Sequence, residues 1–265
     1  MPRSGFLEPV AVRLEDREAA RSSLSIDPIR NAVVIHRMFH HPEFTLAFAD
    51  ARPEPRALLA LKPASSGSQP HQFALHAVDE AAAARVLSAV PTGVSIFHVA
   101  DELAFPAVNR AIEVRWWGEA ILYRMEAAGF RDVQAHEVRP LDPKYAAKVA
   151  TLWAPDWPAE GYVRSRIENG ITGAIYEDGE PVAWYLTHLE TEDVVMLGFL
   201  HVLAPCRGRG YAKSLSCSLL KQTFARGKVP ACHVYTDNGP SIRLMEGLGF
   251  RRVCIQAWGD GLRRS

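Results

Sequence analysis

The chain has 265 residues, of which 48% are hydrophobic and 23% charged, proportions typical of a soluble globular protein with room for two domains. Thirty basic and thirty acidic residues cancel, so bulk charge gives no support for a nucleic-acid partner. No apolar run approaches the roughly 20 residues that cross a bilayer. Four cysteines without metal-ligand spacing predict reduced thiols, no metal site and a cytoplasmic location.

The first half alternates between predicted helices and strands. Asp27 is expected to cap a helix that runs to Met38, with Pro28 in its first turn. The polar segment 65–70 predicts a surface loop or hairpin tip. Apolar patterning predicts strands over 44–51, 56–61, 73–78 and 94–99, helices over 79–87 and 119–127, and a strand from Gly129-Phe130 to Val138.

The second half gives stronger signals. The apolar run Val194–Val202 predicts a strand buried on both faces, and the spacing of leucines after Tyr211 predicts a helix that ends near Gly227. Downstream, the pattern predicts a strand over 233–237 with a turn at Asn238, a short helix over 241–246 and a last strand over 251–257.

The segment between this strand and this helix is rich in Gly and Arg, as a phosphate-binding loop requires. Gly208 and Gly210 can adopt positive φ and let the backbone approach a ligand. The free N–H groups of the next helix then point at the anion, and Arg207, Arg209 and Lys213 add positive charge. The alternative is a surface turn with basic residues.

Three motifs in order resemble the GNAT superfamily of N-acetyltransferases. Arg207-x-x-Gly210-x-Ala212 resembles its acyl-CoA pyrophosphate loop, and Asn238 followed by Leu248-Gly249-Phe250 resembles its closing segment. Gly179–Trp184 resembles the third-strand hairpin of the glycine N-acyltransferase-like, or FR47-like, branch. The resemblance covers residues 139–265 and implies an α/β fold with a mixed sheet.

A short internal repeat predicts a second copy of this unit. EAAGFRDV (126–133) and EGLGFRRV (246–253) are alike, which indicates two tandem GNAT-like units. The first unit has no glycine-arginine loop, so it is expected to be degenerate. We place the domains at 1–138 and 139–265, with a linker at 139–143 where two prolines flank a turn. The alternative is one large α/β domain with an accidental repeat.

The resemblance implies a site for acetyl-CoA or another short acyl-CoA as co-substrate. In the family, main-chain groups of the fourth strand bind the pantetheine arm, and Asn238 is expected at the mouth of a V between parted strands. Alternatively, Asn238 belongs to an ordinary turn. The expected contacts are Leu200, His201, Val202, Arg207, Gly208, Arg209, Gly210, Tyr211, Ala212, Lys213, Asn238 and Ser241.

The catalytic groups are harder to assign. The resemblance implies direct attack of an amine on the thioester, but Met196 stands at the place of the usual glutamate base and Met245 at that of the usual tyrosine acid. His188 and His201 are the candidate bases, with Glu190, Glu192 and Asp193 nearby and a water relay to the backbone also open. Tyr235 is the candidate acid and Tyr211 the other hydroxyl close in sequence, although packing explains the histidines and the tyrosines as well. The tryptophans at 116–117 and 153–157 suit core packing better than an acceptor pocket.

The sequence therefore predicts an acyl-CoA N-acyltransferase acting on a primary amine of a small molecule or amino acid. A CoA-binding sensor or scaffold without turnover, or a protein or peptide N-acetyltransferase, are the alternatives. The expected partners are acyl-CoA and an amine acceptor, with no nucleic acid and no membrane, in a monomer or homodimer.

Overall fold

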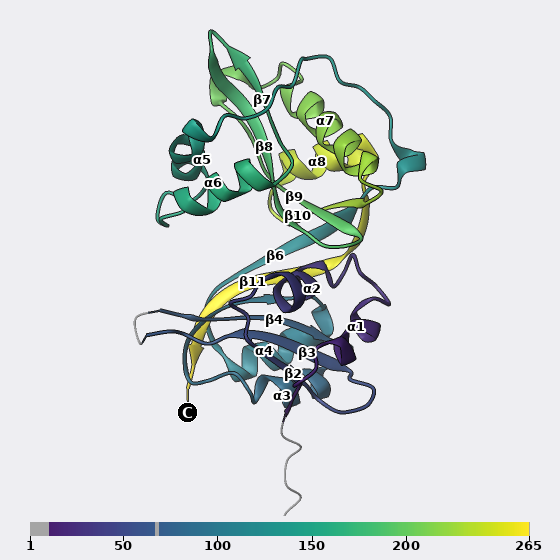
Figure 1. Cartoon of the computed structure of the whole chain (residues 1–265), viewed down its shortest axis with the longest axis vertical. Helices are drawn as coiled ribbons and strands as arrows, with labels where there is room; N and C mark the ends of the chain where they lie inside the picture. Colours follow the sequence, from purple (N-terminus) through teal and green to yellow (C-terminus); the bar gives the residue numbers. More distant parts are fainter. Residues whose placement is uncertain (1–10, 67–68, 265) are drawn as a thin grey trace, which may run out of the picture. The chain divides into compact units, whose positions relative to one another are not determined.

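The computed structural model describes residues 11–66 and 69–264, and the chain divides into two compact units (Figure 1). The first unit comprises the described residues up to Leu122 together with those from Val253 onward, and the second runs from Tyr123 to Arg252. The last strand of the chain thus belongs to the first unit. The predicted boundary between residues 138 and 139 lies inside the second unit, and as a boundary between folding domains it stays a prediction.

The first unit is a sheet with the strand order β1-β2-β3-β4-β5-β11-β6 and helices on its faces. Its strands are β1 (Val12–Arg13), β2 (Leu46–Ala49), β3 (Ala57–Lys62), β4 (His71–Ala77), β5 (Gly93–Val99), β6 (Glu113–Arg124) and β11 (Arg251–Arg263). Its helices are α1 (Glu18–Leu24), α2 (Ala32–Ile35), α3 (Glu80–Leu87) and α4 (Phe105–Ala111), with a π turn at His36–His40 and a 3-10 turn at Glu102–Ala104.

The core of this unit confirms several predicted elements. Helices α3 and α4 pack their alanines and valines on Leu59, Phe73 and Phe97 of the sheet. The Asp79 side chain caps α3 by accepting a hydrogen bond from Ala82 N at 2.7 Å, as its place before an alanine-rich helix predicts. The strands predicted over 44–51 and 56–61 are present as β2 and β3, which pair antiparallel. Residues 67–68 of the predicted hairpin tip lie outside the described residues.

The helix predicted over 119–127 is wrong, because residues 119–124 complete β6 and a 3-10 turn begins at Ala127. Residues 120–123 are all buried, as in a central strand, and Met125 N donates a hydrogen bond to Pro230 O at 3.0 Å. The strand predicted from 130 to 138 is also wrong, since this segment is irregular until Arg139, which bridges to Ala174. The pairing of the sheet here overrides the helix propensity of glutamate, alanine and leucine.

The helix predicted from Asp27 to Met38 is confirmed only in part. Asp27 caps a turn through a hydrogen bond from Arg30 N at 3.0 Å, but regular α-helix is limited to α2. The chain then widens into the π turn, and buried Asn31 donates from Nδ2 to Leu24 O at 3.0 Å. That side-chain bond ties the start of α2 to the end of α1 and interrupts a continuous helix.

The second unit has the strand order β10-β9-β8-β7. Strand β9 has the predicted bounds and helix α7 ends at Ala225, two residues before Gly227, whereas β10 begins at Val229, four residues before the predicted start. The strands are β7 (Thr172–Glu177), β8 (Glu180–Glu190), β9 (Val194–Val202) and β10 (Val229–Tyr235). The helices are α5 (Ala146–Trp153), α6 (Glu160–Asn169), α7 (Tyr211–Ala225) and α8 (Gly239–Leu248), with 3-10 turns at Ala127–Gly129, Pro143–Tyr145 and Ala204–Cys206.

Helices cover both faces of this sheet (Figure 1). On one face, α5 and α6 pack in a cluster that includes Trp184, Leu186 and Phe199. On the other face lies α7, where Ser218 and Gln222 contact the hydroxyl of Tyr185 at 3.3 and 2.6 Å. Neighbouring residues of β8 therefore face opposite layers, as alternation in a strand requires.

The parallel strand pairs of the two units differ at their carboxyl ends. In the second unit β9 and β10 pair from Val194–Val229 to Leu197–Cys232, and β9 then continues beyond this register to Val202. In the first unit β4 and β5 stay paired up to Leu75–Val99, and Ala100 N donates to Leu75 O at 2.8 Å. Among the described residues, the parallel pair of the second unit thus parts at its carboxyl end, whereas that of the first unit stays paired.

Candidate functional site

A cavity of about 480 Å³ lies where β9 runs past β10, at the start of α7. All of the predicted CoA-binding residues except Arg209 and Asn238 line it. The lining residues are Leu200, His201, Val202, Cys206, Arg207, Gly208, Gly210, Tyr211, Ala212, Lys213, Pro240, Ser241 and Leu244. The structure therefore brings the end of the strand, the basic loop and the first turn of α8 together around one space.

The backbone of the loop has the geometry of an anion site. Gly208 and Gly210 have φ of 79° and 83°, a left-handed conformation that a side chain disfavours. Helix α7 begins at Tyr211, and the N–H groups of its first turn have no carbonyl within the helix to bond. Arg207 is held beside them, since its Nε donates to Val202 O at 3.1 Å. Free amides, the helix dipole and a guanidinium thus surround the cavity.

Arg209 is directed elsewhere. Its Nη1 lies 3.1 Å from Glu177 Oε1 on β7, and the Tyr211 hydroxyl donates to the same carboxylate oxygen at 2.5 Å. The guanidinium of Arg209 is therefore engaged with a carboxylate and is not among the groups that line the cavity. The sequence could not show this, because Glu177 lies 32 residues earlier in the chain.

The irregular segment 134–136 supports the loop, which the sequence did not indicate. His136 Nε2 lies 2.8 Å from Arg209 O, and its ring meets the Tyr211 ring edge-on at 4.6 Å between centroids. The main-chain N–H groups of Ala135 and His136 donate to Ser214 Oγ of α7 at 3.1 and 3.2 Å. These contacts hold the loop and the helix start together. Periodicity could not reveal them, since the segment has no regular structure.

Asn238 caps α8, because its side-chain oxygen accepts a hydrogen bond from Ser241 N at 3.2 Å. This is the role of an ordinary N-cap, and it leaves Ser241 as the member of the pair that lines the cavity. The geometry thus favours the turn interpretation over a ligand contact for Asn238.

Asn238→Ala is expected to lower the free energy of unfolding by about 1 kcal/mol, the usual cost of losing an N-cap. The Michaelis constant for acyl-CoA should stay unchanged. Thermal unfolding and steady-state kinetics on the same preparation test both parts. A raised Michaelis constant at an unchanged melting temperature would instead place Asn238 in the ligand site.

His188 lies on β8 and is enclosed by aromatic side chains of other elements. Its ring centroid lies 4.3 Å from that of Phe199, and its Nδ1 lies 3.4 Å from the Tyr162 hydroxyl. Burial, with smaller contributions from His233 and Arg166, lowers the pKa of His188 to about 3. An imidazole with so low a pKa is a weak base, so the geometry favours a packing role.

His201 occupies a more useful place. It is half-buried, it stacks on Trp184 with 4.9 Å between centroids, and it lines the 480 Å³ cavity. Burial first and the charge of Arg207 second lower its pKa below the ordinary value, so the ring is neutral at pH 7. Tyr235, by contrast, ends β10 with 43% of its surface exposed and is not among the residues that line this cavity.

A smaller cavity of about 110 Å³ shares two lining residues, Leu200 and His201, with the first. Its remaining walls are Val149, Leu152, Trp153, Trp184 and Phe199. Strand β9 bulges here, since the register moves from Trp184–His201 to Leu186–Gly198, and Phe199 has a φ of 48°. A left-handed phenylalanine is uncommon and strained, and such outliers concentrate at functional sites.

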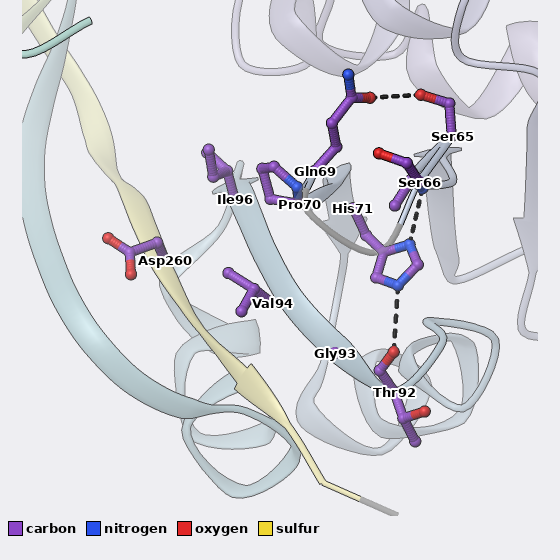
Figure 2. Close-up of a pocket in the computed structure, with 11 residues that line it drawn as sticks. Ser65, Ser66, Gln69, Pro70, His71, Thr92, Gly93, Val94, Ile96 and Asp260 are labelled. Atoms are coloured by element: carbon purple, nitrogen blue, oxygen red, sulfur yellow. Dashed lines mark hydrogen bonds between the residues drawn. The ribbon is translucent and has the colours of Figure 1, made fainter.

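A larger cavity in the first unit contains none of the predicted site residues. About 590 Å³ in volume, it lies beside the exposed Val94 and Ile96 (Figure 2). His71 on its wall has both ring nitrogens engaged, one accepting from Ala64 N at 3.0 Å and the other 3.2 Å from Thr92 O. The charged loop and helix start that characterise the second unit are not part of its lining, so size alone does not mark it as the site.

Within residues 11–66 and 69–264, no three histidine, cysteine or acidic side chains are grouped closely enough to hold a metal ion. No helix in the same part of the chain is long and apolar enough to span a membrane.

Comparisons with known proteins agree with this geometry. Residues 171–258 match the family model of FR47-like proteins, and none of the curated proteins matches the sequence. A solved Drosophila protein is similar over 96% of this chain and 98% of its own, with a TM-score of 0.70 and 16% identity. A GNAT-family acetyltransferase from Colwellia psychrerythraea covers 95% and 99%, with a TM-score of 0.58 and 14% identity.

A tandem GNAT protein from the clavulanic acid biosynthesis pathway is also similar, with a TM-score of 0.56 and 12% identity over 97% of this chain and 98% of its own. The fold is therefore the GNAT fold in tandem form. The match to FR47-like proteins covers residues 171–258, and over the whole chain the likeness to these solved structures is one of fold.

Proposed function

We propose that this protein is an N-acyltransferase that binds acetyl-CoA, or another short acyl-CoA, in its second unit and transfers the acyl group to a small amine. The observation that carries the proposal is the convergence of two left-handed glycines, the start of α7, Arg207 and Lys213 on one cavity. Backbone N–H groups, a helix dipole and two cations are the groups that bind a pyrophosphate.

The parted strands give the rest of the co-substrate a place. Residues 200–202 of β9 line the cavity beyond the point where the pairing with β10 ends. The pantetheine arm is expected to lie along this stretch. A bulge leaves one main-chain group out of the ladder, so the backbone at Phe199–Leu200 is expected to polarise the acyl carbonyl.

The chemistry then needs little from side chains. Alignment of amine and thioester supplies much of the rate, and the thiolate of CoA is a good leaving group. His201 is the imidazole nearest the junction of the two cavities, and we assign it, or a water molecule beside it, to proton transfer. His188 and Tyr235 have weaker claims, because neither lines these cavities.

Arg207→Ala should weaken acetyl-CoA binding by about 1–3 kcal/mol, the value of a charge-assisted hydrogen bond to phosphate. Arg209→Ala should cost less, since its guanidinium is paired with Glu177. Calorimetric titration of both variants at two salt concentrations measures this, and higher salt should reduce the cost of Arg207→Ala. Equal losses for the two arginines would contradict the assignment of the cavity.

Release of free CoA thiol in the presence of an amine panel tests turnover. Thiol release that depends on a small amine supports the acyltransferase. Tight binding of acetyl-CoA without release, across small amines and peptides, would favour a CoA-binding sensor or scaffold. Release with peptides alone would favour a protein or peptide N-acetyltransferase.

A further inference from the structure

The 110 Å³ cavity carries information about the acceptor. We propose that the acceptor is a small amine built on a single aromatic ring, with an amino group that is uncharged at neutral pH. This inference rests on the proposed function, because it names the acceptor of that same transfer. It depends on the walls of the cavity, its size and the charge of its lining.

Three aromatic side chains, Trp153, Trp184 and Phe199, form part of the cavity walls, and Trp157 and Tyr162 lie beside them. Trp153 is the central residue of this aromatic cluster. Its ring centroid lies 4.2 Å from that of Phe199 and 5.9 Å from that of Tyr162. Trp157 extends the cluster at 5.7 Å from Trp153. Both tryptophans remain partly open, with 39% and 52% of their surface exposed. An aromatic ring placed here gains edge-on or offset contacts and buries surface that is now exposed to water.

The size of the cavity admits one ring. Its volume is about 110 Å³. An apolar cavity of roughly 150 Å³ in another protein binds benzene, so the enclosed part of this one holds a single ring at most. The open side, at Leu152 and Trp153, leaves room for a substituent that points to solvent.

The lining offers no counter-charge. Its seven residues are aliphatic or aromatic apart from His201, and none is a carboxylate, a lysine or an arginine. An amino acid would therefore leave its carboxylate without a partner there, and an alkylammonium would lose hydration without a carboxylate to replace it. Aromatic faces do attract a cation, but this attraction stabilises the protonated amine, which has no lone pair for attack.

The pKa values of two nearby imidazoles, His188 and His201, also favour an uncharged amine. Burial lowers the pKa of His188 to about 3, and burial with the charge of Arg207 lowers that of His201. Neither ring is a strong enough base to deprotonate an alkylammonium before attack. An amine attached directly to an aromatic ring arrives with its lone pair already available, because it is neutral at pH 7.

The position of the cavity suits direct transfer. Leu200 and His201 line both cavities, so an amine held in the smaller one lies next to the acyl end of the co-substrate. The amine nitrogen forms a bond to the carbonyl carbon, and the bond from that carbon to sulfur breaks. The nitrogen loses one proton, which passes through His201 or water to the departing thiolate. The products are an N-acyl arylamine and CoA thiol.

A comparison of two isomeric amines as acceptors tests the effect of charge at constant size. 4-Methylaniline and benzylamine have the same atoms, but at pH 7 the first is neutral and the second is an ammonium. With the full chain and saturating acetyl-CoA, kcat/KM from thiol release should be at least about tenfold higher for 4-methylaniline, or roughly 1.4 kcal/mol. Glycine should react more slowly than either. Equal or faster turnover of benzylamine or glycine would overturn the acceptor class and leave the transfer reaction standing.

A pair of variants tests the cavity itself. Trp153→Ala should raise KM for 4-methylaniline at least about fivefold, whereas Trp153→Phe, which keeps an aromatic face, should restore most of the loss. KM for acetyl-CoA should not change in either. Unchanged KM for the amine in Trp153→Ala overturns the location. No thiol release with any amine, despite calorimetric binding of acetyl-CoA, overturns the proposed function and the acceptor class with it. The isomer comparison needs no variant, so it stands even where Trp153→Ala fails to fold.

Discussion

Gly210→Asp is expected to lower the affinity for acetyl-CoA by about 100-fold or more, on the order of 3 kcal/mol. Gly210 is the N-cap of α7 with φ of 83°, and it lines the 480 Å³ cavity where we propose that acetyl-CoA binds. An aspartate at an N-cap bonds the free amides of the first helical turn, so its carboxylate would occupy the groups that the pyrophosphate needs. It would also add a negative charge beside an anion site.

Gly227→Asp is the matched control for this variant. Gly227 follows α7 at its other end, has φ of 70°, and has open space where a side chain would stand, with no place in the cavity. Gly227→Asp therefore has the same backbone strain of an aspartate at positive φ, but it lies outside the proposed pyrophosphate site. Calorimetry should show near-normal affinity for Gly227→Asp. A Gly210→Asp protein that binds acetyl-CoA as tightly as its control would remove the basis for the proposed site.

Most of the residues that line the 480 Å³ cavity could be grouped from the sequence because the signals are local. An apolar run of strand length, two glycines that need positive φ and a helix that begins at Tyr211 follow one another without a gap. Each signal restricts the backbone of its own segment, and the three together place the loop at the end of the strand. The first unit gives the same kind of agreement at α3, where Asp79 and the alanines after it define the helix start.

The incorrect predictions concern features that depend on contacts with segments far away in the sequence. Residues 119–124 have helix-forming side chains, yet they complete β6, which lies beside β11 near the other end of the sequence. Arg209 has the charge of a phosphate ligand, but Glu177 and Tyr211 determine where its guanidinium points. The register of β9 is a further case, because no residue preference predicts a left-handed Phe199. Such features follow from pairing between strands, which single-segment patterns do not contain.

Gly198→Ala is expected to destabilise the second unit by about 1–3 kcal/mol, the usual cost of overpacking a full core. A Cβ at Gly198 would lie 2.1 Å from His188 Cδ2 and 2.4 Å from His188 Nε2, far inside contact distance. The imidazole has little room to retreat, since Phe199 and Trp153 pack against it at 4.3 and 5.8 Å between centroids. The strain would fall on the bulge of β9, where the two cavities meet.

Gly247→Ala in helix α8 is the control, because a Cβ there meets nothing within 4 Å and alanine is the better helix former. Its free energy of unfolding should stay the same or rise by up to about 1 kcal/mol. In the double variant Gly198→Ala/His188→Ala, the clash is gone, so the combined loss should be smaller than the sum of the single losses by about 1 kcal/mol or more. Urea unfolding followed by tryptophan fluorescence measures all four proteins. Strict additivity of the two substitutions would show that His188 does not fill the space beside Gly198. The His188 ring would then not support Phe199 at the wall of the smaller cavity.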